Sequence, residues 1–265
     1  GTDIMLEVDP ENEGAFEEAT ANLVLNHDYE ELGSELVTNR DFASDTIWTK
    51  GSGWTIGSGV ATCDGTNSAL LFQSLANTTT NDIFKATYTI SNYVSGSVFV
   101  GFGSGLVQPS GTTRNANGTY TQYLTKTSTS TSFGFKSISF VGSIDNISVK
   151  EVDPNDRWVL GTGWSISDGK AVAVATSSSG FSITQNNILT SNTQYEITYT
   201  LSDITAGSVR FRANLVSGTQ RGSNGTYTEI ITTAGDDFAF QGLDSFVGKI
   251  DNVTVKEYAI TPLNV

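Results

Sequence analysis

The chain closes two separate stretches with nearly the same phrase. FVGSIDNISVKE covers residues 140–151, and FVGKIDNVTVKE covers residues 246–257. Earlier landmarks recur in the same order, among them a Gly-rich turn before Trp54 and Trp164 and an Asn-Gly-Thr-Tyr sequence. A repeat of this length predicts two copies of one compact module, because a domain of ordinary size fits twice into 265 residues. Duplication of a small unit favours a display or binding architecture over catalysis.

Each copy carries the alternation of apolar and polar residues that is typical of half-buried strands. The pattern runs through residues 84–90 in the first copy and 195–201 in the second. With 27 Gly and few helix-forming stretches, the sequence predicts an all-β fold of two tandem antiparallel β-sandwich modules of the jelly-roll type. On the outward phase of the next strand Phe99 corresponds to Arg210, so we expect the two exposed surfaces to meet different neighbours.

The charge pattern suggests how the chain is divided. Residues 1–35 hold eleven acidic residues and no Lys or Arg, within a chain whose net charge is −14. We therefore expect an acidic, mostly extended N-terminal arm over residues 1–35, module 1 over 36–153, module 2 over 154–258 and a C-terminal tail over 259–265. The arm is either a solvated leader or a peptide that orders against another subunit. Without a basic stripe nucleic acid is not an expected partner, and no apolar run is long enough for a membrane span.

Three segments carry a family resemblance: ELVTNRDF at residues 35–42, TIWTKGSGWTI at 46–56 and SIDNISVKEV at 143–152. They resemble the carbohydrate-binding-module-like, or galactose-binding-like, jelly rolls of tailed-bacteriophage virion proteins. The resemblance implies a non-enzymatic protein of the virion surface, a head decoration or head-fibre protein that docks through its arm. Its partners would be other virion proteins and further copies of itself. The alternatives are a tail-associated adhesin for a host surface glycan and a carbohydrate-binding module of a secreted bacterial polysaccharide-active enzyme.

The second copy departs from this pattern at its start. DPNDRWVLGTGW, residues 153–164, stands where the first copy has the ELVTNRDF opening. The first strand of module 2 is therefore missing or supplied from elsewhere, and the strand ending at Glu151 and Val152 is the expected donor.

The resemblance also implies a structural calcium ion near the first and last strands, with Asn39, Asp41 and Asp145 as ligands. No other cofactor is expected. In an unbroken strand Asp145 and its counterpart Asp251 would point toward the core, so the alternative is that each accepts backbone N–H bonds at a bulge. The second copy keeps Asp251 but lacks the Asn–Asp pair of the opening, which favours this structural alternative.

The four tryptophans divide into two pairs. Trp54 and Trp164 are in phase with core residues and are predicted to pack inside. Trp48 and Trp158 precede the glycines and are expected to be more exposed. They are the candidates for stacking on a glycan.

No catalytic constellation is found. A single histidine, His27, and a single cysteine, Cys63, leave no Ser–His–Asp set and no cysteine metal cluster. Asp236 and Asp237 are adjacent, so strand alternation would send them to opposite faces. We expect a protein that is not an enzyme.

Overall fold

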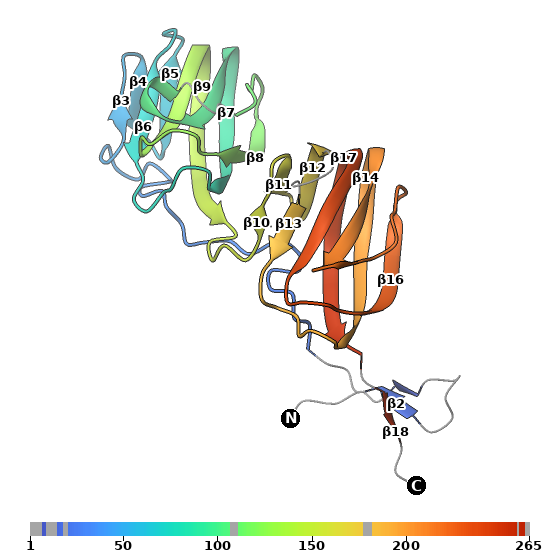
Figure 1. The fold of residues 1–265 in the computed structure, drawn as a ribbon. Coiled ribbons are helices and arrows are strands. Elements are labelled where there is room, and N and C mark those ends of the chain that lie inside the picture. The colour runs from blue at the N-terminus through green and yellow to red at the C-terminus, as the bar shows by residue number, and fades with distance from the viewer. Residues whose placement is uncertain are drawn as a thin grey trace. The chain divides into compact units, whose positions relative to one another are not determined.

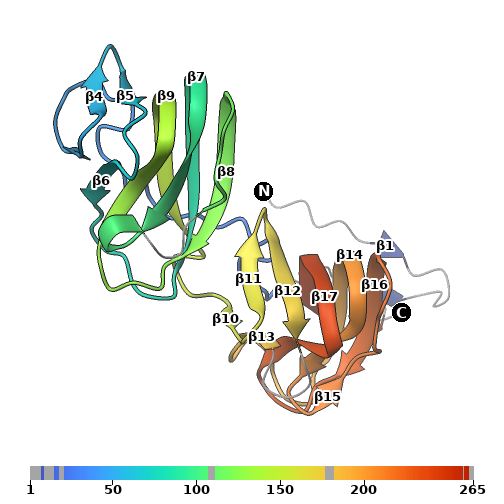
Figure 2. The same cartoon turned by 90° about the horizontal axis from the view of Figure 1, so that it is seen from above.

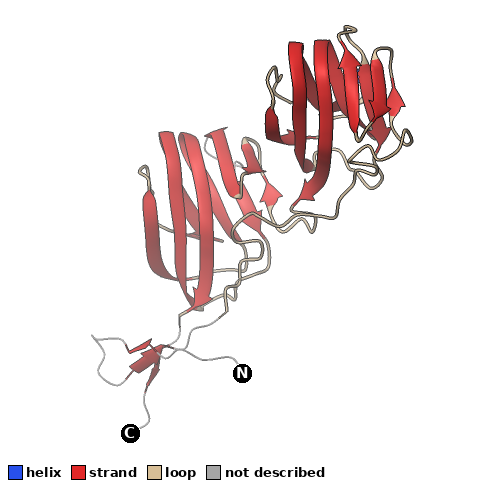
Figure 3. Ribbon diagram, turned by 180° about the vertical axis from the view of Figure 1, so that it is seen from behind, coloured by secondary structure: helices blue, strands red, loops and turns tan. Residues whose placement is uncertain are grey.

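The computed structural model describes residues 7–8, 15–17, 21–106, 111–176, 182–258 and 260–262. Apart from a short 3-10 turn at Ser104–Leu106, the regular elements of these residues are strands (Figure 3). None of the helical residues in this part of the chain forms a helix that is long and apolar enough to span a membrane. The chain divides into two compact units. We call residues 32–154 module 1, and residues 1–31 with 155–265 module 2. The expected all-β fold of two tandem β-sandwich modules is confirmed.

Module 1 is built on two long antiparallel strands that pair along their whole length. The strand order is β3-β6-β9-β5-β4, and β7 pairs with both β8 and β9. The strands are β3 (Thr49–Lys50), β4 (Trp54–Gly57), β5 (Val60–Asp64), β6 (Leu70–Ser74), β7 (Ile83–Phe102), β8 (Gly118–Thr125) and β9 (Ser132–Val152).

The two long strands bend in the middle, which turns one continuous ladder into two layers. The register of β7 against β9 shifts on both sides of Ser95, and Gly96 adopts a φ of 71°. A Cβ at Gly96 would lie 1.9 Å from the carbonyl oxygen of Ser139, so only glycine fits this bend. The two ends of β7 then face each other, because the rings of Phe84 and Phe102 lie 4.9 Å apart. The core of the module fills the space between these layers.

Module 2 repeats this arrangement. Its strand order is β10-β13-β17-β12-β11, and β14 pairs with β15, β16 and β17. Gly207 takes the place of Gly96 at the bend, with a φ of 63°. Figures 1 and 2 show the same pair of long central strands in both modules. The strands are β10 (Val159–Leu160), β11 (Trp164–Ser167), β12 (Lys170–Thr176), β13 (Ser182–Gln185), β14 (Gln194–Ala213), β15 (Val216–Ser217), β16 (Gly225–Thr232) and β17 (Phe238–Glu257).

The first part of module 2 comes from residues 21–31, which we call opening segment 2. The N–H of Leu23 donates to the carbonyl of Val255 at 2.9 Å, and the N–H of Val253 donates to the carbonyl of His27 at 3.0 Å. Gln185 holds the same segment through its side chain, since its Oε1 accepts the N–H of Leu25. The segment therefore adds a further antiparallel stretch beside β17, along which it runs in blue in Figure 1.

Residues 32–42, opening segment 1, make the same bonds in module 1. The N–H of Leu36 donates to the carbonyl of Val149 at 2.9 Å, and the N–H of Ile147 donates to Arg40 at 3.0 Å. Gln73 Oε1 accepts the N–H of Thr38. NLVLNHDY at residues 22–29 thus occupies in module 2 the place of ELVTNRDF at 35–42 in module 1.

Two sequence-based expectations are wrong here. Residues 21–35 are not an arm, because 21–31 are built into module 2 and 32–35 into module 1. The end of β9 is not the donor to module 2 either, since opening segment 2 already lies beside β17. The overall acidity of residues 1–35 concealed a short apolar segment that bonds to β17. Module 1 is therefore an insertion in module 2, and the chain passes between them at residues 31–32 and 154–155.

Part of the remaining N-terminal stretch pairs with the C-terminal tail. The strands β1 (Glu7–Val8), β2 (Ala15–Glu17) and β18 (Ile260–Pro262) form a small antiparallel sheet in the order β1-β2-β18. The described residues of the expected arm are extended at β1 and β2. The rest of residues 1–20, with 259 and 263–265 of the expected tail, lies outside the described residues.

Candidate functional site

A hollow on the outer face of module 2 is the candidate site. Three neighbouring strands, β13, β17 and β14, place Thr184 opposite Ala239 and Ala239 opposite Arg212. Neighbouring residues such as Phe211 and Phe240 point into the core, so the intervening side chains point outward. The short side chain of Ala239, between two longer ones, leaves a depression of about 250 Å³. Its lining is Ser182, Thr184, Arg212, Asn214, Asp237, Ala239 and Gln241, which we call the β13–β17–β14 groove.

Arg210 stands next to this groove and is held in place by Gln241. Its Nε and Nη2 both donate to Gln241 Oε1 at 3.1 Å. The two residues lie opposite each other on β14 and β17, so the contact joins adjacent strands. This bond fixes the guanidinium of Arg210 across the sheet.

Arg212 lies in the groove with a buried donor that is not used. Its Nε is shielded from solvent and has no hydrogen-bond partner among the described residues. None of the ion pairs found within the described ranges involves Arg210 or Arg212. Because this Nε is shielded, a ligand in the groove meets Arg212 at its terminal nitrogens, which make no hydrogen bond among the described residues.

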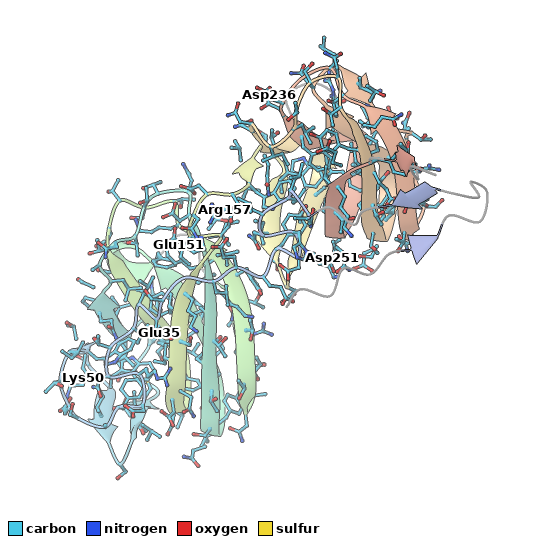
Figure 4. All side chains as sticks on the ribbon, turned by 90° about the horizontal axis from the view of Figure 1, so that it is seen from below. Glu35, Lys50, Glu151, Arg157, Asp236 and Asp251 are labelled. Carbon is cyan, nitrogen blue, oxygen red and sulfur yellow. The ribbon has the colours of Figure 1, made fainter. Side chains whose placement is uncertain are left out.

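Asp237 closes one end of the groove. Its Oδ1 accepts the N–H of Asn187 at 3.1 Å, and its carbonyl accepts the N–H of Asn214 at 3.0 Å. Asp236 is exposed on the preceding turn, where Figure 4 labels it. From sequence, Asp236 and Asp237 are expected on opposite faces, and neither is predicted to belong to a site. Only the pairing of β13 with β17 brings Asp237 near Thr184.

The corresponding face of module 1 is chemically different. Leu70, Lys136 and Phe99 occupy the register of Ser182, Gln241 and Arg210. Two residues further along each strand, module 1 has Phe72, Gly134 and Gly101 where module 2 has Thr184, Ala239 and Arg212. The difference between Phe99 and Arg210 thus extends over the whole face. That the two faces meet different neighbours stays a prediction.

The expectation that Trp48 and Trp158 are exposed is wrong. Their relative exposures are 5% and 3%, so neither ring presents a face for a sugar to stack on. Each indole N–H donates to an opening segment, Trp48 to the carbonyl of Asn39 at 3.1 Å and Trp158 to that of Asn26 at 3.0 Å. These rings anchor the opening segments. Trp54 and Trp164 are buried as predicted.

A backbone hydrogen bond brings the candidate calcium ligands into the same region, but each side chain bonds to residues close to it in sequence. Arg40 bonds to Ile147 of β9, which brings residues 39–41 beside the strand of Asp145. Asn39 donates to the carbonyls of Ser44 and Thr46, Asp41 accepts the N–H of Ala43, and Asp145 accepts the N–H of Asn146. Within the described ranges no three His, Cys, Asp or Glu side chains are grouped so as to hold a metal ion. As arranged, these oxygens do not fit a calcium ion. The calcium prediction is tested by comparing the melting temperature with and without a chelator.

A bulge explains the position of Asp145. The register of β7 against β9 shifts between Thr87 and Thr89, and Asn146 adopts a φ of 52°. This breaks the alternation and leaves Asp145 half-buried instead of facing the core. Asp251 is placed likewise in module 2, where it forms an ion pair with Lys170.

The opening segments of both modules carry an Asn–Asp pair, contrary to the expectation for module 2. Module 2 does have an Asn–Asp pair in its opening, because Asn26 and Asp28 stand where Asn39 and Asp41 stand in module 1. Both modules carry the pair, so it does not discriminate between the structural and the metal-binding hypotheses.

A second polar cluster is common to both modules. The guanidinium of Arg114 lies 4.7 Å from the ring centre of Tyr120, and that of Arg221 lies 4.6 Å from that of Tyr227. Behind them, burial raises the pKa of Tyr88 to about 12 and the pKa of Tyr199 to about 12. Because both copies keep this cluster, we assign it to the structure of the module.

Comparison with known proteins places the chain in no family. No protein-family model matches, and no curated protein matches. Among solved structures, the tandem CBM22-1-CBM22-2 domain of Paenibacillus barcinonensis Xyn10C is 10% identical, with a TM-score of 0.36 over 86% of this chain and 98% of that one. The tandem CBM51 modules of Sp3GH98 from Streptococcus pneumoniae SP3-BS71 are 10% identical, with a TM-score of 0.24 over 96% and 95%. At these values the likeness assigns neither a family nor a ligand.

Proposed function

We propose that this chain is a non-catalytic carbohydrate-binding protein and that the β13–β17–β14 groove of module 2 holds the saccharide. The observation that carries the proposal is a hollow lined by hydrogen-bonding side chains on the outer face of a paired sheet. Sugar hydroxyls both donate and accept hydrogen bonds. Arg212 supplies donors, Asp237 supplies acceptors, and Asn214 and Gln241 supply both.

The acid groups of the groove favour binding over hydrolysis. A glycosidase needs two carboxyl groups that face each other across the scissile bond. Asp237 is the one carboxylate among the described lining residues, and its Oδ1 is already bonded to the N–H of Asn187. This arrangement supports a binding role.

The role on a virion surface stays a prediction from sequence, together with virion protein partners and self-association. Neither the described residues nor the comparisons bear on it. Of the hypotheses drawn from the sequence, the groove favours glycan binding.

The proposal is tested by calorimetric titration of the full chain against a panel of soluble polysaccharides. Arg212→Ala and Gln241→Ala should each weaken binding roughly ten- to hundred-fold, as expected for the loss of a hydrogen bond to a charged or planar group. Lys136→Ala is the matched control, because Lys136 holds in module 1 the register position of Gln241. Unchanged binding in both groove variants, with the native fold retained, would sink the proposal.

A further inference from the structure

We infer that the groove selects an acidic saccharide and binds a uronate carboxylate at Arg212, with Arg210 as the second positive charge. The inference rests on the proposed function and names its ligand class.

Two positive charges stand side by side here without a neutralising carboxylate in the described part of module 2. The sequence has 28 acidic and 14 basic residues, so the chain as a whole does not lack carboxylates. Arg210 and Arg212 nevertheless stand two residues apart on one face of β14, and neither is within ion-pair distance of a carboxylate among the described residues. Asp237, which shares the groove with Arg212, is instead bonded to Asn187. The positive charge is left for a ligand.

The bonds already made decide which guanidinium takes the carboxylate. A carboxylate binds Arg best through two parallel N–H groups, either from Nε and one Nη or from the two Nη groups. In Arg210 the Nε edge is occupied, because Nε and Nη2 both donate to Gln241. In Arg212 the Nε is shielded from solvent, but the two Nη groups make no hydrogen bond within the described part of the chain. Arg212 therefore offers its terminal edge, and Arg210 adds charge from a fixed position.

The rest of the lining suits a sugar ring more than a bare anion. Asp237 at one end would repel a second negative charge but accepts hydroxyl groups, and Ser182 and Thr184 add neutral partners. A uronate residue has one carboxylate and several hydroxyls, which matches one charged end and one hydroxyl-accepting end.

Module 1 provides the internal control. The two arginine positions are Phe99 and Gly101 there, on the same bent strand pairing. The fold does not require arginine at either place. Their presence in module 2 alone points to a ligand rather than to the sheet.

The test compares uronate oligosaccharides with their methyl esters, which keep the ring and hydroxyls but remove the charge. The full chain should bind the acid form at least about ten-fold more tightly than the ester, and this preference should shrink as salt is raised. Arg212→Gln should abolish the preference, whereas Lys136→Gln in module 1 should leave it unchanged. Circular dichroism of each variant checks that the fold is retained.

The outcomes separate the inference from the proposed function. Equal binding of acid and ester, lost in Arg212→Gln, would overturn the acidic ligand and keep a neutral glycan. Free acetate competing as well as the oligosaccharide would overturn the saccharide part of the inference. Failure of acid, ester and every neutral polysaccharide to bind would overturn both.

Discussion

At the scale of single residues, the tryptophans show how a side chain that suggests binding serves the fold. Trp158 of module 2 packs its ring 5.0 Å from that of Tyr29, and Trp48 of module 1 lies 5.4 Å from Phe42. In both pairs the partner comes from an opening segment. An indole with one N–H and a large apolar surface joins the segment to the core by both kinds of contact.

Trp158→Ala should lower the free energy of unfolding of module 2 by about 3–5 kcal/mol, because it empties a buried site and removes the bond to Asn26. Differential scanning calorimetry should show a lower melting temperature for the transition of module 2 and an unchanged one for module 1. Val159→Ala is the control, since Val159 is 54% exposed and its truncation should change stability by less than about 0.5 kcal/mol. A shift in the transition of module 1 would contradict this assignment of Trp158.

The buried tyrosines predict a loss of stability in alkali. The pKa of Tyr88 and of Tyr199 is raised by burial to about 12 in the folded chain, above the ordinary value near 10. Above pH ~10 the unfolded chain releases these protons and the folded chain does not, so stability should fall between pH ~10 and ~12. Near-ultraviolet titration of phenolate should show a component that ionises near pH 12 and is reduced in a Tyr88→Phe or Tyr199→Phe variant.

Tyr199→Phe tests the cause of this pH dependence. The phenylalanine keeps the ring contacts with Phe211 and Phe240 but has no proton to lose. The variant should lose less stability than the parent over the same pH range. An identical pH profile would show that the alkaline loss has another origin.

At the scale of elements, the opening segments decide whether each sandwich is complete. Opening segment 2 adds buried Val24 and Tyr29 to module 2, as opening segment 1 adds Val37 and Phe42 to module 1. Each segment also caps the last long strand, since Asn22 Oδ1 accepts the N–H of Val255 and Glu35 Oε1 accepts that of Val149.

Val24→Asp should detach opening segment 2 and unfold module 2, because a carboxylate at a site that is 2% exposed has no partner. Hydrogen exchange should show lost protection in β12 and β17 and unchanged protection in β5 and β9. Val37→Asp is the mirror control, with the loss expected in β5 and β9. Protection retained in β17 of Val24→Asp would refute the role of the segment.

The sequence predicts those parts of the fold that depend on local alternation. The inward phases of β7 and β14 follow from period-two patterns, and the closing repeat identifies β9 and β17. Opening segment 2 could not be predicted from the sequence, because NLVLNHDY shares only Leu, Val, Asn and Asp with ELVTNRDF. It also lies in an acidic stretch. The groove could not be predicted from the sequence either, because Thr184, Ala239 and Arg212 come together only when three strands distant in sequence pair.

At the scale of the whole molecule, the chain is nested and not merely repeated. Both segments of module 2 flank module 1 in sequence, so module 2 completes its fold only after module 1 has been synthesised. The two segments meet along β17 and again at the junction, where Asn155 bonds to Glu31 and Arg157 pairs with Glu31 at 3.6 Å.

Removing residues 32–154 and joining residue 31 to 155 through a short Gly-Ser linker should leave a folded module 2. Glu31 and Asn155 are already in contact, so the linker closes a short gap at low entropic cost. Circular dichroism and melting should show one cooperative β-sheet transition. Residues 155–258 alone, without opening segment 2, should not fold, and their independent folding would contradict the nested arrangement.

The nesting also decides how the chain responds to tension. Load applied at residues 21 and 258 passes through the bonds between opening segment 2 and β17, and module 1 lies outside that path. Leu23 pairs near Val255 and His27 near Val253, so the load meets the pair at one end and opens it bond by bond. Once the segment has peeled away, module 1 enters the path. Under such a load opening segment 2 should therefore detach first and lengthen the chain before module 1 carries force.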